Sequence, residues 1–143
     1  MSNQIQNSNN KKLYDLTERT AKFGENIIDF AKILPNTVIN RPLINQIVRA
    51  GTSIGANYME ADAAESKKDF QHKINLCKKE AKETMHWLRM LAKANIDKTD
   101  TCREFYKEVH ELVLIFSTIV ARSKQIKKWF WILNFELDLT FGF

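Results

Sequence analysis

Glycine and proline are scarce in this chain, with four and two residues among 143. This scarcity excludes a collagen-like chain, which needs glycine at every third position. The charged residues, 27% of the total, are spread along the sequence, which argues against broad disorder. With 44% hydrophobic residues the chain is long enough for one domain with a core and too short to expect two.

Long apolar runs are also missing. No uninterrupted stretch approaches the roughly 18 residues that a membrane-spanning helix needs. The residues after Met1, SNQIQNSNNKK, are polar, so they do not resemble a secretory signal. We therefore expect a cytoplasmic protein that does not associate with a membrane.

Cysteine is limited to Cys77 and Cys102, at no spacing typical of disulfides or zinc sites. We expect two free thiols, with Cys77 buried because it falls in the apolar pattern of its helix. Glu83 and His86 have the E-x-x-H spacing of di-iron bundles, but no second such pair exists. The sequence therefore predicts no metal site and no cofactor.

Apolar residues recur every three or four positions over four stretches, at about 14–34, 40–65, 66–95 and 101–123. Short connections between four long helices make neighbours antiparallel. The predicted fold is all-α, an up-down-up-down four-helix bundle over residues 13–125. A flexible polar arm, residues 1–12, precedes it, and an apolar tail, residues 126–143, follows. From Phe135 the tail alternates apolar and polar residues, as a strand does, but its structure is left open.

Helix ends carry capping signals. Ser66 with Asp69 and Thr101 with Glu104 have the spacing of capping boxes and predict the starts of the third and fourth helices. For the other ends we expect Asn40 or Arg41 to cap the second helix and Asn95 to take a left-handed position after the third.

The segment Arg49–Glu60, RAGTSIGANYME, is rich in small residues although it lies in a helical pattern. Each glycine weakens a helix by up to about 1 kcal/mol, so a compensating contact is expected. Gly51 and Gly55 are four residues apart and allow another helix to approach closely. Beside them runs a polar stripe: Arg49, Ser53, Asn57 and Glu60. With Glu83 and Trp87 of the third helix, we expect this stripe to fix helix register or a subunit contact rather than to catalyse.

The fourth helix is apolar in every direction between Leu112 and Phe116. A helix that is hydrophobic all round needs a second covering surface, and one bundle offers each helix only one. Leu76, Trp87 and Met90 form a further apolar flank on the third helix. We therefore expect a homo-oligomer. The alternative is that a loop or the tail covers these side chains.

Basic residues occupy one arc of the third helix. The arc holds Lys68, Lys78, Lys79, Lys82, His86, Arg89 and Lys93. No acid interrupts it, whereas a solvated helix usually intersperses Glu with Lys for local pairing. A like-charged arc is better tolerated when a polyanion neutralises it, so we expect RNA or DNA binding. Because stacking aromatics are not interleaved with the lysines, phosphate contacts are expected with little reading of sequence.

Two sequence runs resemble a known family. The run R-x-x-x-S-I-x-x-N-x-x-E begins at Arg49, and E-A-K-E-T-x-x-W-L-R-x-L spans Glu80 to Leu91. Both resemble the bacterial four-helix-bundle proteins encoded in intervening sequences of 23S rRNA genes, which are similar to the accessory variability proteins of diversity-generating retroelements. Many members have Gly after the motif glutamate, where this chain has Ala61. The resemblance implies a homopentamer, nucleic-acid binding and a reverse transcriptase as a candidate partner.

Two other functions remain open. Arg103 and His110 have the R-x4-6-H spacing of HEPN-type ribonucleases, and a resemblance to those would imply metal-independent RNA cleavage. A scaffold that binds a protein partner and no nucleic acid is the other alternative. The hypothesis favoured by the sequence is a non-enzymatic, oligomeric nucleic-acid-binding protein that acts through Lys78, Lys82, Arg89 and Lys93.

Overall fold

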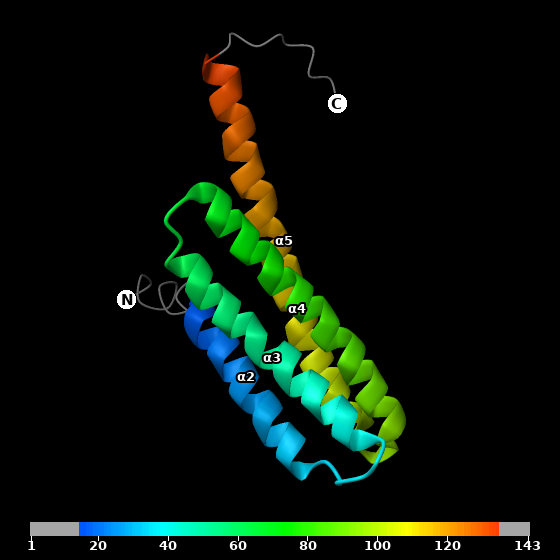
Figure 1. Cartoon of the computed structure of the whole chain (residues 1–143). Helices are drawn as coiled ribbons and strands as arrows, with labels where there is room; N and C mark the ends of the chain where they lie inside the picture. The colour runs from blue at the N-terminus through cyan, green and yellow to red at the C-terminus, as the bar shows by residue number, and fades with distance from the viewer. Residues whose placement is uncertain (1–14, 135–143) are drawn as a thin grey trace, which may run out of the picture.

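Four long helices form an antiparallel bundle (Figure 1). The computed structural model describes the backbone of residues 15–134 and the side chains of residues 15–124. The helices are α2 (Leu16–Ile33), α3 (Asn40–Asp62), α4 (Lys67–Ala94) and α5 (Thr99–Asn134), with a short 3-10 helix, η1 (Ile96–Lys98), before α5. This confirms the predicted all-α four-helix bundle. The arm predicted at residues 1–12 lies outside the described part of the chain.

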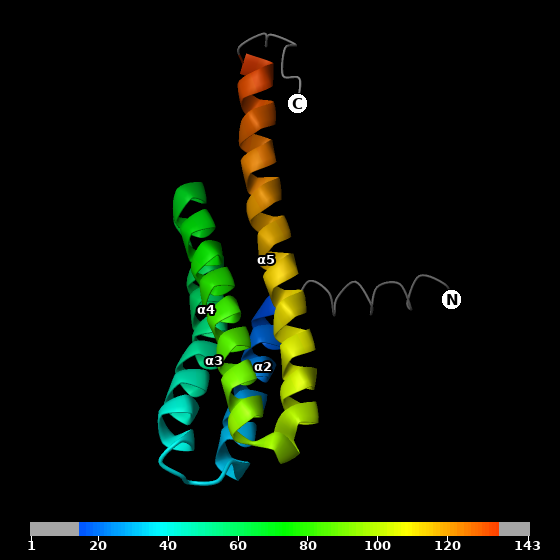
Figure 2. The ribbon, with the colours of Figure 1, turned by 90° about the vertical axis from the view of Figure 1, so that its right-hand side faces the viewer.

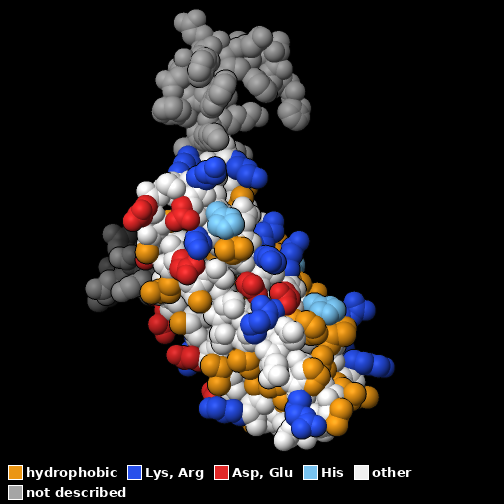
Figure 3. All heavy atoms as spheres, in the orientation of Figure 1, with side chains coloured by type: hydrophobic (Ala, Val, Ile, Leu, Met, Phe, Trp, Pro, Cys, Tyr) orange, Lys and Arg blue, Asp and Glu red, His pale blue; other side chains and the backbone are white. Residues whose placement is uncertain are grey.

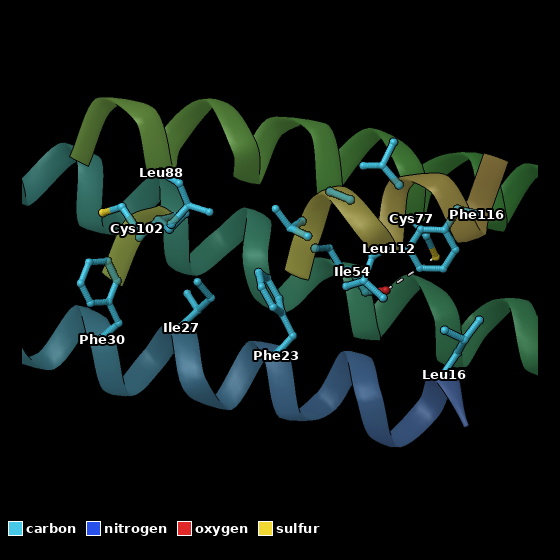
Figure 4. Close-up of a cluster of buried hydrophobic side chains, with 14 of the residues drawn as sticks. Leu16, Phe23, Ile27, Phe30, Ile54, Cys77, Leu88, Cys102, Leu112 and Phe116 are labelled. Carbon is cyan, nitrogen blue, oxygen red and sulfur yellow. Dashed lines mark hydrogen bonds between the residues drawn. The ribbon is translucent and has the colours of Figure 1, made fainter. Parts of the chain in front are cut away.

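The core runs along the bundle axis and receives side chains from all four helices (Figure 4). Ile27, Ile54, Leu88, Leu112 and Phe116 are among the largest side chains with almost no exposed area. At about 25 cal/mol per Å² of apolar surface, a buried side chain of this size contributes about 2 kcal/mol or more. The three-to-four-residue spacing therefore places the core correctly on each helix.

Helices α2 and α3 approach closely at the two glycines predicted to allow it. A Cβ atom on Gly51 would lie 3.1 Å from Cγ2 of Ile27 on α2. A Cβ on Gly55 would lie 3.4 Å from the backbone of Thr20. The contact with α2 compensates for the weak helix propensity of the glycines, because Gly51 makes room for the Ile27 side chain and Gly55 lets the α2 backbone at Thr20 come close.

The predicted helix ends are only partly correct. The Ser66 hydroxyl accepts a 3.0 Å hydrogen bond from the Asp69 amide, so the cap of α4 is confirmed. The prediction for Thr101 is wrong, because η1 leads directly into α5 and the helix already begins at Thr99. Asn95 follows α4 with φ of −134°, so its predicted left-handed conformation is also wrong.

At the start of α3, the prediction that Asn40 or Arg41 provides the cap is wrong. The side chain of Ile39, the residue before the helix, makes no capping hydrogen bond. Instead the backbone N–H of Asn40 donates to the Thr37 hydroxyl at 3.0 Å. The Asn40 side chain is buried and donates to the Pro35 carbonyl at 2.9 Å, so it is occupied elsewhere.

Asn40 and Asn95 form a buried amide pair that joins the start of α3 to the end of α4. Each side-chain NH₂ donates to the other's carbonyl oxygen, at 2.8 and 2.9 Å. Asn95 also donates to the Leu91 carbonyl at 3.0 Å. Each side-chain amide of the pair thus has hydrogen-bond partners for its oxygen and its nitrogen. Buried polar groups need such partners because they have lost their contacts with water.

Asn40→Ala is expected to lower the free energy of unfolding by about 2 kcal/mol, because the Asn95 amide loses its buried partner. Urea unfolding of Asn40→Ala, Asn95→Ala and the double variant would measure the effect. We expect the double variant to lose much less than the two single variants added together. Additive losses would show that the two side chains stabilise the fold independently.

The apolar run of α5 is mostly buried within one chain. Leu112, Val113 and Phe116 are buried, Ile115 is half-buried, and Leu114 is 54% exposed. The predicted need for a second covering surface is therefore wrong except at Leu114, because α5 packs on α4 and its side chains also contact α2. Self-association itself stays a prediction.

Helix α5 is longer than the sequence pattern predicts. It has 36 residues and continues to Asn134, past the ends of the other helices (Figure 2). Residues 126–134, placed in the tail by composition, are therefore helical. The strand-like alternation from Phe135 lies beyond the described residues.

Both cysteines are free and buried, as predicted for Cys77. Burial raises the pKa of the Cys77 thiol to about 12, so the reactive thiolate is scarce at neutral pH. Burial also raises the pKa of Cys102. The two thiols therefore serve as small core side chains.

Candidate nucleic-acid interface

Helix α4 carries a charge excess as large as that of the whole chain. Its 28 residues include eight Lys or Arg and three Asp or Glu, a difference of +5, and the full chain also has a net charge of +5. Figure 3 shows Lys and Arg side chains along α4, with fewer Asp and Glu side chains beside them. The positive charge of the protein is thus concentrated on one helix.

The predicted basic arc faces solvent. Lys78 is half-buried, and the other members are exposed: Lys68, Lys79, Lys82, His86, Arg89 and Lys93. The buried residues of α4, Ile74 to Leu91, lie on the opposite side, against α3 and α5. We refer to Lys68, Lys78, Lys79, Lys82, Arg89 and Lys93 as the basic face.

No carboxylate neutralises the basic face at close range. Over residues 15–124, no Asp or Glu oxygen lies within 4.0 Å of a side-chain nitrogen of these six residues. Two of the three acids of α4, Glu80 and Glu83, contact Arg49 of α3 instead. Acids of adjoining helices thus leave the arc uncompensated.

The dimensions of the basic face suit an extended polyanion. Lys78 and Lys93 are fifteen residues apart, about 22 Å along the helix, and Lys68 lies about 15 Å further along. Phosphates along one nucleic-acid strand are several ångströms apart, so a helix of this length can reach several of them. A single small anion would leave most of these cations unpaired.

Aromatic side chains are poorly placed for stacking on bases. Trp87 is half-buried, and its indole N–H donates to Glu83 at 3.1 Å. The His86 ring meets Trp87 edge to face, with ring centroids 4.8 Å apart. Among the described residues of α4, no Phe, Tyr or Trp side chain is exposed, and the exposed rings belong to histidine. Contacts to phosphate are therefore favoured over base stacking.

The polar stripe of α3 forms an ion cluster with α4. Arg49 donates to Glu80 at 3.2 Å and also to Glu83, which accepts from Trp87. Glu60, the last residue of the stripe, pairs with Lys73 at 2.8 Å, and this contact raises the pKa of Lys73. Arg49 and Glu60 therefore join α3 to α4 through Glu80, Glu83 and Lys73, while Trp87 holds Glu83 within α4.

Two members of the stripe act locally. The Ser53 hydroxyl donates to the Arg49 carbonyl, and the Asn57 amide donates to the Ser53 carbonyl at 2.9 Å. Neither contacts α4 through a hydrogen bond within the described residues. Sequence reasoning missed Glu80 and Lys73, although each lies on the same side of α4 as the residues that face α3.

Arg49→Met is expected to lower the free energy of unfolding by about 1 kcal/mol, a modest loss because the arginine is partly exposed and solvent screens the pairs. Chemical denaturation at low and high salt would measure it. The loss should shrink at 1 M salt. A loss of the same size at both salt concentrations would show that Arg49 acts through packing and not through charge.

A second ion cluster, which the sequence analysis did not anticipate, joins α2 to α5. Arg19 donates to Glu108 at 2.8 Å and pairs with Glu111 at 3.1 Å. The hydrogen bond to Glu108 is the main cause of a raised Arg19 pKa. Glu108 and Glu111 are three residues apart on one helix face, which could have suggested that they share a basic partner. The sequence does not identify Arg19 as that partner.

The residues of the alternative sites do not converge. Arg103 and His110 are both exposed on α5, about 10 Å apart along the helix axis, and Arg103 lies 3.5 Å from Asp100. Glu83 faces Arg49, whereas His86 lies on the solvent side. Among the described residues, no three His, Cys, Asp or Glu side chains are grouped so that they could hold a metal ion.

The fold and the surface define a class of protein, a small antiparallel four-helix bundle with one uncompensated cationic helix. The chain belongs to the 23S rRNA-intervening sequence protein family, whose model matches residues 12–117. It is also similar to a solved protein of unknown function from the S23 ribosomal protein family of Bacteroides thetaiotaomicron. The two are 32% identical with a TM-score of 0.67, over 73% of this chain and 96% of that one. A comparison with curated proteins gave no match.

The family match covers α2, α3, α4 and about the first half of α5, but not α5 after residue 117. None of the helices described here is long and apolar enough to cross a membrane.

Proposed function

We propose that this protein binds RNA or DNA, without enzymatic activity, through the basic face of α4. The observation that carries the proposal is the absence of carboxylates within 4.0 Å of this face among residues 15–124. A row of like charges raises the free energy of the folded protein, and a polyanion that neutralises the row lowers it. Binding also releases counterions from the nucleic acid, which supplies most of the affinity for a phosphate-contacting surface.

The contacts are with phosphate, so little sequence preference is expected. Lysine acts as a compact point charge, and five of the six residues of the basic face are lysine. No exposed Phe, Tyr or Trp interrupts the basic face in the described part of α4. An RNA hairpin and a DNA hairpin of the same sequence should therefore bind with similar affinity.

Self-association is a second part of the proposal. Leu114 is more than half exposed, and Leu76, Trp87 and Met90 are half-buried on α4. Burying these side chains between copies would remove apolar surface from water. The pentamer and the reverse-transcriptase partner implied by resemblance stay predictions.

One gel-retention experiment separates the three functions. Labelled RNA hairpin is incubated at low salt with the wild type and with His110→Ala, and RNA length is read from a denaturing gel. The proposal predicts retained, full-length RNA with both proteins. RNA shortened by the wild type but not by His110→Ala would establish the ribonuclease function instead. No retention by the wild type would favour a protein-binding scaffold.

A further inference from the structure

An open hollow lies beside the α3–α4 turn, where α5 leaves the bundle. About 600 Å³ of space is bounded by the turn, the first turn of α4 and one side of α5. Ala64, Phe70 and Ile119 form its apolar lining, and all three are only half-buried. Its volume is in the range of sites that hold small ligands or short peptide segments.

The rim of the hollow is positively charged. Lys67 and Arg122 are exposed at its edge, and no carboxylate within residues 15–124 lies within 4.0 Å of either. Glu65 is the single acid of the lining. An occupant should therefore combine apolar side chains with negative charge.

Residues 135–143, FELDLTFGF, have this composition. Five apolar residues alternate with polar ones, and the segment carries two acids, Glu136 and Asp138, but no Lys or Arg. Alternation places the apolar side chains of an extended segment on one face and the acids on the other. Such a segment can fill an apolar hollow with its apolar face while the positive charge of the rim attracts its acids.

The segment is long enough to reach the hollow of its own chain. Helix α5 continues eleven residues from Ser123, in the lining, to Asn134, which is about 16 Å along the helix. Nine extended residues span up to about 30 Å. After a reversal of direction, about five residues bring the chain back level with Ser123, and the last residues of the segment can enter the hollow.

We propose that residues 135–143 fold back along α5 and dock their apolar face in the hollow between the α3–α4 turn and α5 of the same chain. Phe141 and Phe143 cover Phe70 and Ile119, while Glu136 and Asp138 lie further along α5 and are attracted to the positive charge of Arg122 and Lys67 over a longer distance. The proposal does not depend on nucleic-acid binding.

Disulfide trapping in the full chain tests this placement. Glu65→Cys puts an exposed thiol at the hollow, and Thr140→Cys puts one on the polar side of the segment. The matched control pairs Thr140→Cys with Val38→Cys, an exposed position at the opposite end of the bundle (Figure 1). Cys77 and Cys102 are buried, so they do not compete.

Under mild oxidation, the Glu65→Cys and Thr140→Cys pair should form a disulfide within one chain. We expect at least about tenfold more product than from the control pair, since docking raises the local thiol concentration. Adding Lys67→Glu and Arg122→Glu should reduce the yield. Equal yields from both pairs would overturn the proposal. A disulfide that joins two chains would overturn it as well, and would assign the hollow to a segment of another copy.

Discussion

Replacing Lys78, Lys82, Arg89 and Lys93 with Glu is expected to weaken binding of an RNA hairpin by at least about hundredfold at low salt. Neutralising four phosphates gives a salt exponent of about −3 to −4, which corresponds to about hundredfold between 50 and 200 mM salt. The substitution removes these contacts and adds repulsion from four carboxylates. Three of the four side chains are exposed and Lys78 is half-buried, so helicity and assembly should persist.

The matched control moves the same charge elsewhere. Replacing Lys22, Lys32, Arg103 and Lys107 with Glu changes the net charge by the same amount, but these exposed residues lie on α2 and α5. Fluorescence anisotropy with a labelled hairpin would compare the two variants. If the control variant loses as much affinity as the α4 variant, binding reflects net charge and the basic face has no special role.

Gly51→Leu is expected to lower the free energy of unfolding by about 2–3 kcal/mol. A Cβ at this position already lies 3.1 and 3.2 Å from two carbons of Ile27, which is itself fully buried. The remaining carbons of leucine have no space between α2 and α3, and overpacking of this kind typically costs about 1–3 kcal/mol. Leucine has a better helix propensity than glycine, but this gain is at most about 1 kcal/mol and is smaller than the cost of the clash.

Ala56→Leu serves as the control for Gly51→Leu. Ala56 is exposed on the same helix, so the added side chain enters solvent and should change stability little. Thermal unfolding followed by circular dichroism would compare both with the wild type. Equal stability of Gly51→Leu and the wild type would show that α2 can move away from α3 without loss.

Local patterns predicted the helices and the basic face because both depend on one helix at a time. Apolar spacing identified the buried side of each helix, and a helical wheel placed Lys78 and Arg89 on the solvent side. Gly51 and Gly55 indicated a close contact, but only the structure identifies α2 as the partner. Features of a single helix are thus readable from sequence.

Features that depend on pairing between helices could not be predicted. Asn40 looks like a cap in the sequence, yet its side chain is used by Asn95, 55 residues away. The three-to-four-residue apolar spacing suggested that the last helix ends near Ser123, with residues 126–143 as a separate tail, but α5 continues to Asn134. The sequence shows that no acid interrupts the basic arc, but the shared contact of Glu80 and Glu83 with Arg49 depends on the packing of α3 on α4.

The most direct test of the basic face is the salt dependence of RNA binding by the wild type and the four-Glu variant of α4. We expect the logarithm of the wild-type association constant to fall linearly with the logarithm of salt concentration, with a slope of about −3 to −4. Residual binding by the variant should have a slope near zero. A wild-type slope near zero, or the same slope for both proteins, would contradict binding of nucleic acid through this face.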